Sequence, residues 1–140
     1  MRELTALLIA VTYGVVLIAA WGFTSLAIDV DVITEKDAGP LLGPAIATGA
    51  IVVTWLWIAR RRQGAKAILS GLAAAASVLV VMLLVGGIGY MLTRGEVVWL
   101  LLFASKYATS PFVIIPALLA GVAVAITPTA KPFARLRGRD

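Results

Sequence analysis

The stretch Arg60-Arg61-Arg62-Gln63-Gly64-Ala65-Lys66 carries four positive charges and no negative charge within seven residues. On both sides of it the chain is apolar over a length that matches the hydrocarbon core of a bilayer, about 30 Å. The whole chain is 61% hydrophobic and 14% charged, whereas soluble domains have about 25% charged residues. We therefore expect the basic stretch to be a turn in water between two membrane-spanning helices.

Four apolar segments are long enough to cross a bilayer as α-helices. They cover residues 4–28, 41–59, 67–93 and 97–127. Ser25-Leu26-Ala27 resembles a signal cleavage site, but the apolar run before it is longer than the apolar region of a signal peptide, which has about 7–15 residues. The sequence therefore predicts an all-α, polytopic membrane protein whose four antiparallel transmembrane helices form one domain, residues 1–140.

The basic residues predict the orientation, because cytoplasmic loops of membrane proteins are enriched in Lys and Arg. Arg2, the turn at residues 60–66 and the tail at residues 131–140 fall on one side and hold nine of them. The other side holds two or three: Lys36, Arg94 and, if it reaches the surface, Lys106. We expect a multi-pass protein of the cytoplasmic (plasma) membrane with both termini in the cytoplasm.

The basic residues beside the apolar segments are expected to contact anionic lipid headgroups, at about 1 kcal/mol each. They include Arg60, Arg61, Arg62, Lys66, Arg135 and Arg137. A net charge of +5 also suits a nucleic-acid partner. The clustering of the charges next to apolar segments favours the lipid bilayer instead, so we expect no nucleic-acid partner.

The chain lacks the residues of several kinds of catalytic site. It has no cysteine and no histidine, which excludes thiol nucleophiles, imidazole bases and the usual zinc and haem ligands. The loop after the first segment is acidic, but its spacing does not match a calcium-binding EF-hand; its acidic residues are Asp29, Asp31, Glu35 and Asp37. We interpret this loop as solvated and expect no metal site, no cofactor, no catalytic residue and no enzymatic activity.

Lys106 is the one charged residue within the four segments. If the last helix starts at Val97, Lys106 lies near mid-membrane, at a cost of about 2.5–3.5 kcal/mol, and with Thr109 and Ser110 it forms a candidate substrate or ion path. If Tyr107–Thr127 spans alone, Lys106 reaches the outer interface and residues 97–105 are an interfacial or re-entrant piece. The second interpretation is favoured, because no carboxylate lies within a segment to pair with a buried Lys106; a contact with Asp29 or Asp31 is then expected.

Small residues recur at helical spacing and predict close helix packing, since helices in lipid associate through such contacts. The candidate packing residues are Gly14, Gly49, Gly71, Ala117 and Gly121. Residues 44–49 also resemble residues 116–121 at an offset of 72 residues, and Gly14 maps onto Gly86. This repetition predicts two tandem hairpins, residues 1–66 and 67–140, related by an axis along the membrane normal.

Two functions remain open. The first is a non-enzymatic accessory or assembly subunit that contacts the helices of a membrane protein partner, because the predicted spans carry ridges of small residues and almost no polar groups. The second is a small homo-oligomeric transporter or channel with its path near Lys106, Thr109 and Ser110. A single copy encloses little volume, so a pore requires further copies.

Overall fold

The computed structural model of the chain describes residues 2–34, 36–61 and 66–127, and the regular structure in these ranges is entirely α-helical. The described helices follow one another as α1 (Arg2–Ile28), α2 (Leu42–Arg60), α3 (Ala67–Arg94), α4 (Val98–Tyr107) and α5 (Pro111–Ile126). The predicted all-α fold class is thereby confirmed.

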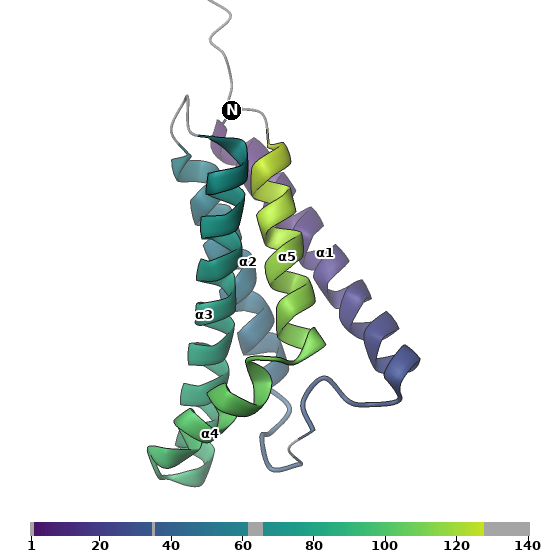
Figure 1. Ribbon diagram of the computed structural model, residues 1–140, viewed down its shortest axis with the longest axis vertical. Helices are drawn as coiled ribbons and strands as arrows, with labels where there is room; N and C mark the ends of the chain where they lie inside the picture. The colour runs from purple at the N-terminus through teal and green to yellow at the C-terminus, as the bar shows by residue number, and fades with distance from the viewer. Residues whose placement is uncertain (1, 35, 62–65, 128–140) are drawn as a thin grey trace, which may run out of the picture.

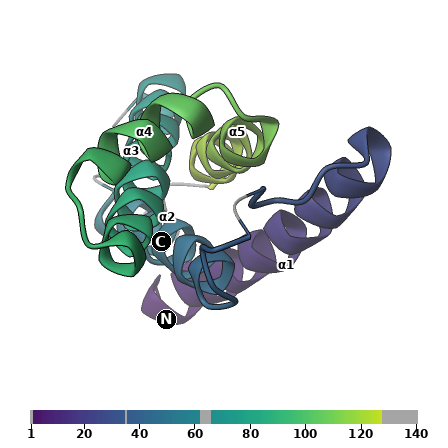
Figure 2. The same cartoon turned by 90° about the horizontal axis from the view of Figure 1, so that it is seen from below.

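Helices α2, α3 and α5 run side by side, whereas α1 leans away from them towards its C-terminal end (Figures 1 and 2). Helix α3 contacts α2, α4 and α5, and α1 contacts α2 and α5. The start of α1, the end of α2, the start of α3 and the end of α5 share one end of the bundle (Figure 1). We call this the basic end, after Arg60, Arg61 and Lys66, and we call the opposite end, with residues 29–34, residues 36–41 and α4, the loop end.

Helices α1, α2 and α3 are each long and apolar enough to cross a membrane. Helices α4 and α5 reach that length and hydropathy only as a pair. The described residues therefore contain three candidate spans, or four if the bent pair counts as one. Many large apolar side chains lie on the outside, among them Phe23 and Leu26, which are 75% and 82% exposed. An exposed apolar surface of this extent is what a helical protein in lipid presents.

Residues 97–127, predicted as one span, form two helices that are bent by 71° at residues 108–110. The cause is local. Pro111 has no N–H and disfavours helical backbone at the residue before it. Ser110 accordingly has an extended backbone, with φ −70° and ψ 135°, and its side chain accepts a hydrogen bond from the Phe112 N–H (3.3 Å). Ser110 thus caps a new helix, with Pro111 at its first position.

Helix α3 is the centre of the bundle and buries one face along its whole length. Ala74, Val78 and Met82 are at most 1% exposed, at the four-residue spacing of a helix face. Helix α4 packs across the C-terminal part of α3 because Gly86 and Gly87 lack side chains. A Cβ atom at Gly86 would lie 2.3 Å from the ring of Phe103, and one at Gly87 would lie 3.1 Å from Leu100.

The tandem hairpin repeat stays a prediction. At the proposed offset of 72 residues, α4 (Val98–Tyr107) corresponds to residues 26–35, of which 26–28 end α1 and 29–34 belong to the following loop. Pro44 is the third residue of α2, whereas Pro116 is the sixth residue of α5. The two hairpins therefore differ in secondary structure at the loop end.

Candidate functional site

Helices α3 and α5 meet backbone to backbone at Gly71 and Gly121. A Cβ atom added to Gly71 would lie 2.7 Å from the Gly121 carbonyl oxygen, and one added to Gly121 would lie 2.8 Å from the Gly71 carbonyl oxygen. Ala75 and Ala125 flank the contact, because their Cβ atoms lie 3.0 Å from these positions. The two backbones touch directly, which is how small residues let helices approach each other.

The other candidate packing residues also lie at helix contacts. A Cβ atom on Gly14 of α1 would lie 2.7 Å from Ile51 Cδ1 of α2, and one on Gly49 would meet Val81 and Val85 of α3 at 3.3 Å. Ala117 in α5 is 3% exposed and belongs to the main core. All five residues singled out for packing therefore face other helices of the same chain.

Helix α1 is attached to α5 by two hydrogen bonds. The Tyr13 hydroxyl donates to the Pro116 carbonyl (3.0 Å), and the indole N–H of Trp21 donates to the Phe112 carbonyl (2.7 Å). The second bond repairs a defect in α5. Pro116 has no N–H to donate to the carbonyl four residues earlier, which is that of Phe112. Trp21 supplies the missing donor, as required where no water replaces it.

At the basic end, Arg61 caps the C-terminus of α5. Its guanidinium donates to the carbonyl oxygens of Val124 and of Thr127, the latter at 2.7 Å. The last carbonyls of a helix lack partners within the helix and carry partial negative charge. Arg61 is only 8% exposed, so most of its side chain is engaged within the bundle and not with headgroups.

Arg60 and Lys66, two other predicted headgroup contacts, are exposed at the same end. Arg62, Arg135 and Arg137 lie outside the described residues. Of the three predicted headgroup contacts within the described residues, Arg60 and Lys66 therefore face outward, whereas Arg61 is part of the helix packing.

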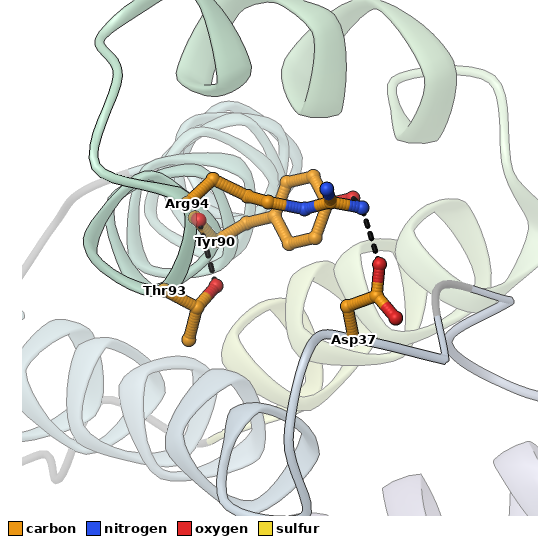
Figure 3. Close-up of polar contacts among 4 residues, drawn as sticks. All are labelled: Asp37, Tyr90, Thr93 and Arg94. Atoms are coloured by element: carbon orange, nitrogen blue, oxygen red, sulfur yellow. Dashed lines mark hydrogen bonds and ion pairs between the residues drawn. The ribbon is translucent and has the colours of Figure 1, made fainter.

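At the loop end, Arg94 joins α3 to the loop before α2 (Figure 3). Its guanidinium forms an ion pair with Asp37 and donates to the Tyr90 hydroxyl (3.3 Å). It also lies 4.8 Å from the ring centroid of Trp99, within the range of a cation–π contact. The Thr93 hydroxyl donates to the Tyr90 carbonyl (2.8 Å).

A row of aromatic rings continues from Arg94 along the seam between α3 and α4. Tyr90 contacts Trp99 edge-on at 5.7 Å and Phe103 at 5.9 Å, and Phe103 stacks on Tyr107 at 4.3 Å. The Tyr107 hydroxyl accepts from the Thr34 N–H (3.0 Å) and bonds to the Thr34 hydroxyl (3.1 Å). These contacts attach the loop and α4 to the end of α3.

The three residues of the candidate path lie around the break between α4 and α5. Lys106, in the last turn of α4, and Thr109, in the break, are exposed, and Ser110 is the half-buried cap of α5. The ammonium of Lys106 lies 5.8 Å from the Tyr107 ring centroid and borders a cavity of about 260 Å³ against α3. Lys106 is therefore outside the helix core, and the three residues do not line an internal channel through the bundle.

The described residues contain no group of three or more acidic, histidine or cysteine side chains placed to hold a metal ion. Asp37, from the acidic loop, is engaged with Arg94. The expected absence of metal, cofactor and catalytic residues stays a prediction.

Sequence reasoning missed the residues that tie the helices together by side chains: Tyr13, Trp21, Arg61 and Arg94. Part of the signal was present, because Pro116 lies within an apolar segment. A proline there leaves the carbonyl four residues earlier without a hydrogen-bond donor from its own helix. Which side chain supplies that donor depends on how α1 packs against α5. Among the interactions of these four residues, the bonds from Tyr13 and Trp21 join two apolar helices and are the ones that a membrane environment would make hardest to lose.

Comparison with known proteins gives one result. No curated protein and no solved structure matches the chain. A protein family matches it over residues 1–131, which takes in all five helices described above. The chain belongs to this family, the Family of unknown function (DUF6121).

Proposed function

We propose that the chain is a multi-pass protein of the cytoplasmic membrane with four crossings and both termini in the cytoplasm. The fourth crossing is the bent pair α4–α5, in which α5 carries most of the crossing and α4 reaches the outer interface. Support comes from the shared basic end, where α1 starts and α5 ends, because both ends of an even number of crossings lie on one side. The excess of Lys and Arg at this end supports a cytoplasmic location for it.

The absence of cysteine from the sequence makes this topology directly testable. Single-cysteine variants at Lys36 and Lys66 place one thiol at each end of the bundle. An impermeant maleimide added to intact cells should label Lys36→Cys, and Lys66→Cys only after lysis. Labelling of Lys66→Cys in intact cells would contradict the proposed orientation.

Within this membrane topology, we propose a non-enzymatic accessory or assembly role in which α1 contacts a helix of a partner membrane protein. The observation that carries the proposal is Gly22. Among the described glycines that lie within helices, it alone has nothing within 4 Å of the position that a Cβ atom would take, whereas the others face neighbouring atoms of the chain. Gly22 lies three residues after exposed Ala19, in the C-terminal third of α1, and is itself exposed. Small residues on an outer helix face permit close approach by another helix.

A photo-crosslinking residue in place of Leu26, one turn after Gly22 and 82% exposed, tests this proposal. A crosslinked product of defined mass is expected in native membranes and should be lost in the Gly22→Leu background. Ala76→Leu, on the outer face of α3, is the matched control and should retain the product. Two epitope tags distinguish a different partner from a second copy. A product that Gly22→Leu leaves unchanged would rule out this contact.

The transporter or channel is the second candidate, and the observation that favours it is the broken helix. Breaks of this kind occur where a transport path meets backbone groups freed from a helix. The path would have to form between copies, since the described core of one copy is filled by apolar side chains. Under this alternative the purified protein is a defined homo-oligomer and Lys106→Met abolishes flux in proteoliposomes. A monomer in mild detergent would speak against it.

A further inference from the structure

An apolar groove with a volume of about 370 Å³ lies between α1 and α5. Helix α1 contributes one face to it and helix α5 contributes the other; the main apolar side chains are Ile9, Val16, Leu119, Val122 and Ile126. Val122 and Ile126 are 56% and 74% exposed. The groove therefore opens to the outside of the bundle.

The hydroxyl groups in the walls of the groove already have partners. Thr12 donates to the Leu8 carbonyl (2.9 Å) and Thr127 donates to the Ala123 carbonyl (2.6 Å). Tyr13 donates to the Pro116 carbonyl of α5 (3.0 Å). Each of these hydroxyls has its one proton engaged, so the walls offer no free hydroxyl donor to a polar occupant, and burying polar groups with few partners is costly. The groove consequently selects an apolar occupant.

The length of the groove argues against a transmembrane helix as that occupant. Its walls cover residues 9–16 and 119–127, which is about 10–12 Å at about 1.5 Å per residue. A crossing helix would need about 30 Å of contact and is itself about 10 Å wide. One hydrocarbon chain lying parallel to the helices fits a groove that is short, narrow and open on one side.

The charge at one end of the groove identifies the class of lipid. The groove ends at Thr127, whose carbonyl accepts from Arg61 at the basic end. The sequence on that side of the predicted membrane holds nine Lys and Arg residues against two acidic ones, Glu3 and Asp140. An excess of positive charge favours an anionic headgroup over a zwitterionic one.

We propose that the groove between α1 and α5 holds one acyl chain of an anionic phospholipid from the leaflet at the basic end. The phosphate of that lipid lies among the basic residues, with exposed Arg60 available to it. This inference rests on the membrane topology proposed above but not on the partner contact at Gly22.

The test uses the full chain, purified in mild detergent with equal amounts of dioleoyl phosphatidylglycerol and dioleoyl phosphatidylcholine, and native mass spectrometry to count retained lipids. The wild-type chain should retain one phosphatidylglycerol. Ala123→Phe places a ring in the groove and should lower that occupancy by at least about tenfold, the effect of losing a few buried methylene contacts. Ala76→Phe, on the outer face of α3, should behave as the wild type.

A second measurement needs no variant. Phosphatidylglycerol with a diazirine in its acyl chain is photolysed with the wild-type protein, and the adducts should map to residues 9–16 and 119–127. Adducts spread evenly over α3, equal retention of phosphatidylcholine, or unchanged retention by folded Ala123→Phe would each overturn the inference. A rise in oligomer dissociation with Ala123→Phe would overturn it in favour of a second copy in the groove. Wild-type protein missing from the membrane fraction would instead overturn the proposed topology.

Discussion

Helices α3 and α1 hold helix α5 in opposite ways. On the α3 side, Gly71 and Gly121 bring the two backbones into contact. On the α1 side, long side chains cross a wider gap, with Tyr13 and Trp21 donating to carbonyls of α5 and an apolar groove alongside. The α3–α5 seam forms because glycine has no side chain, whereas the α1–α5 seam is made by long side chains.

The two seams correspond to the two kinds of contact by which helices associate in lipid. Helices in lipid gain nothing from hiding apolar surface, so they associate through close packing and through hydrogen bonds. The α3–α5 seam uses close packing and leaves no room for adjustment. The α1–α5 seam uses hydrogen bonds at points along α1 and tolerates open space between them. We expect α3–α5 to be the rigid part of the molecule and α1 to be the part that separates first.

The largest effect is expected from Gly71→Leu, which breaks the α3–α5 seam. The new side chain would begin 2.7 Å from a backbone oxygen of Gly121, and a backbone atom cannot move aside as a flexible side chain does. Overpacking of this kind costs about 3 kcal/mol or more. Thermal unfolding of the purified protein in detergent should show a large fall in Tm or no folded protein.

The matched control is Gly22→Leu in α1, where nothing lies within 4 Å of the added Cβ atom. Its Tm should stay at or slightly above the wild-type value, because leucine favours helix more than glycine does. Equal losses of Tm in Gly71→Leu and Gly22→Leu would mean that the two seams do not differ as described.

A smaller effect is expected from Arg61→Met, which removes the cap of α5 at the basic end. Methionine keeps an unbranched apolar side chain but donates no hydrogen bond to Val124 or Thr127. Loss of charge-assisted bonds at a helix C-terminus should cost about 2 kcal/mol. Arg60→Met is the control, since Arg60 is exposed. Comparable losses of Tm in both variants would show that general charge, and not the cap, stabilises this end.

The sequence was sufficient for the helical fold and for most helix bounds, because long apolar segments and charged turns are local signals. The segments predicted at residues 41–59 and 67–93 agree with α2 and α3 within one residue at each end. The form of residues 97–127 was left open, as one span or as a shorter span from Tyr107 preceded by an interfacial or re-entrant piece, and the helix breaks before Pro111. A proline inside an apolar segment either bends a helix or starts a new one, and the composition of residues 97–127 does not distinguish the two outcomes. The position of α4 against α3, through Gly86 and Gly87, decides it.

The candidate site was less predictable, because the tertiary contacts of charged residues are not local. Arg61 looks like its neighbours Arg60 and Arg62 in the sequence, yet it reaches the end of a helix 63 residues later in the chain. Lys106 is the reverse case. Lys106 was singled out because it lies within an apolar segment. At the break between α4 and α5, however, its side chain is exposed.

On the α1 side, Trp21→Phe removes one hydrogen bond to α5 and should lower the free energy of unfolding by about 1 kcal/mol, the usual range for a hydrogen bond between helices in lipid. The physical reason is the Phe112 carbonyl, which Pro116 leaves without an intrahelical donor. The double variant Trp21→Phe with Pro116→Ala restores an N–H at residue 116, so Trp21→Phe should cost less in that background. Additive losses of Tm across this cycle would mean that the indole N–H does not serve the proline defect.

The smallest effect is expected at the loop end, from Asp37→Asn. The ion pair with Arg94 is open to solvent, since the two side chains are 62% and 36% exposed, and exposed pairs contribute little because water and salt screen them. Arg94 also keeps its contacts with Tyr90 and Trp99 when the carboxylate is gone.

The fall in Tm for Asp37→Asn should be smaller than for Trp21→Phe and should disappear in high salt. The control, Asp31→Asn in the same exposed loop, should have no effect on Tm at either salt concentration. A loss that persists in high salt would mean that Asp37 positions the loop through its shape or its hydrogen bond and not through its charge. The attachment of the loop, and with it the connection from α1 to α2, would then be as specific as the glycine contact between α3 and α5.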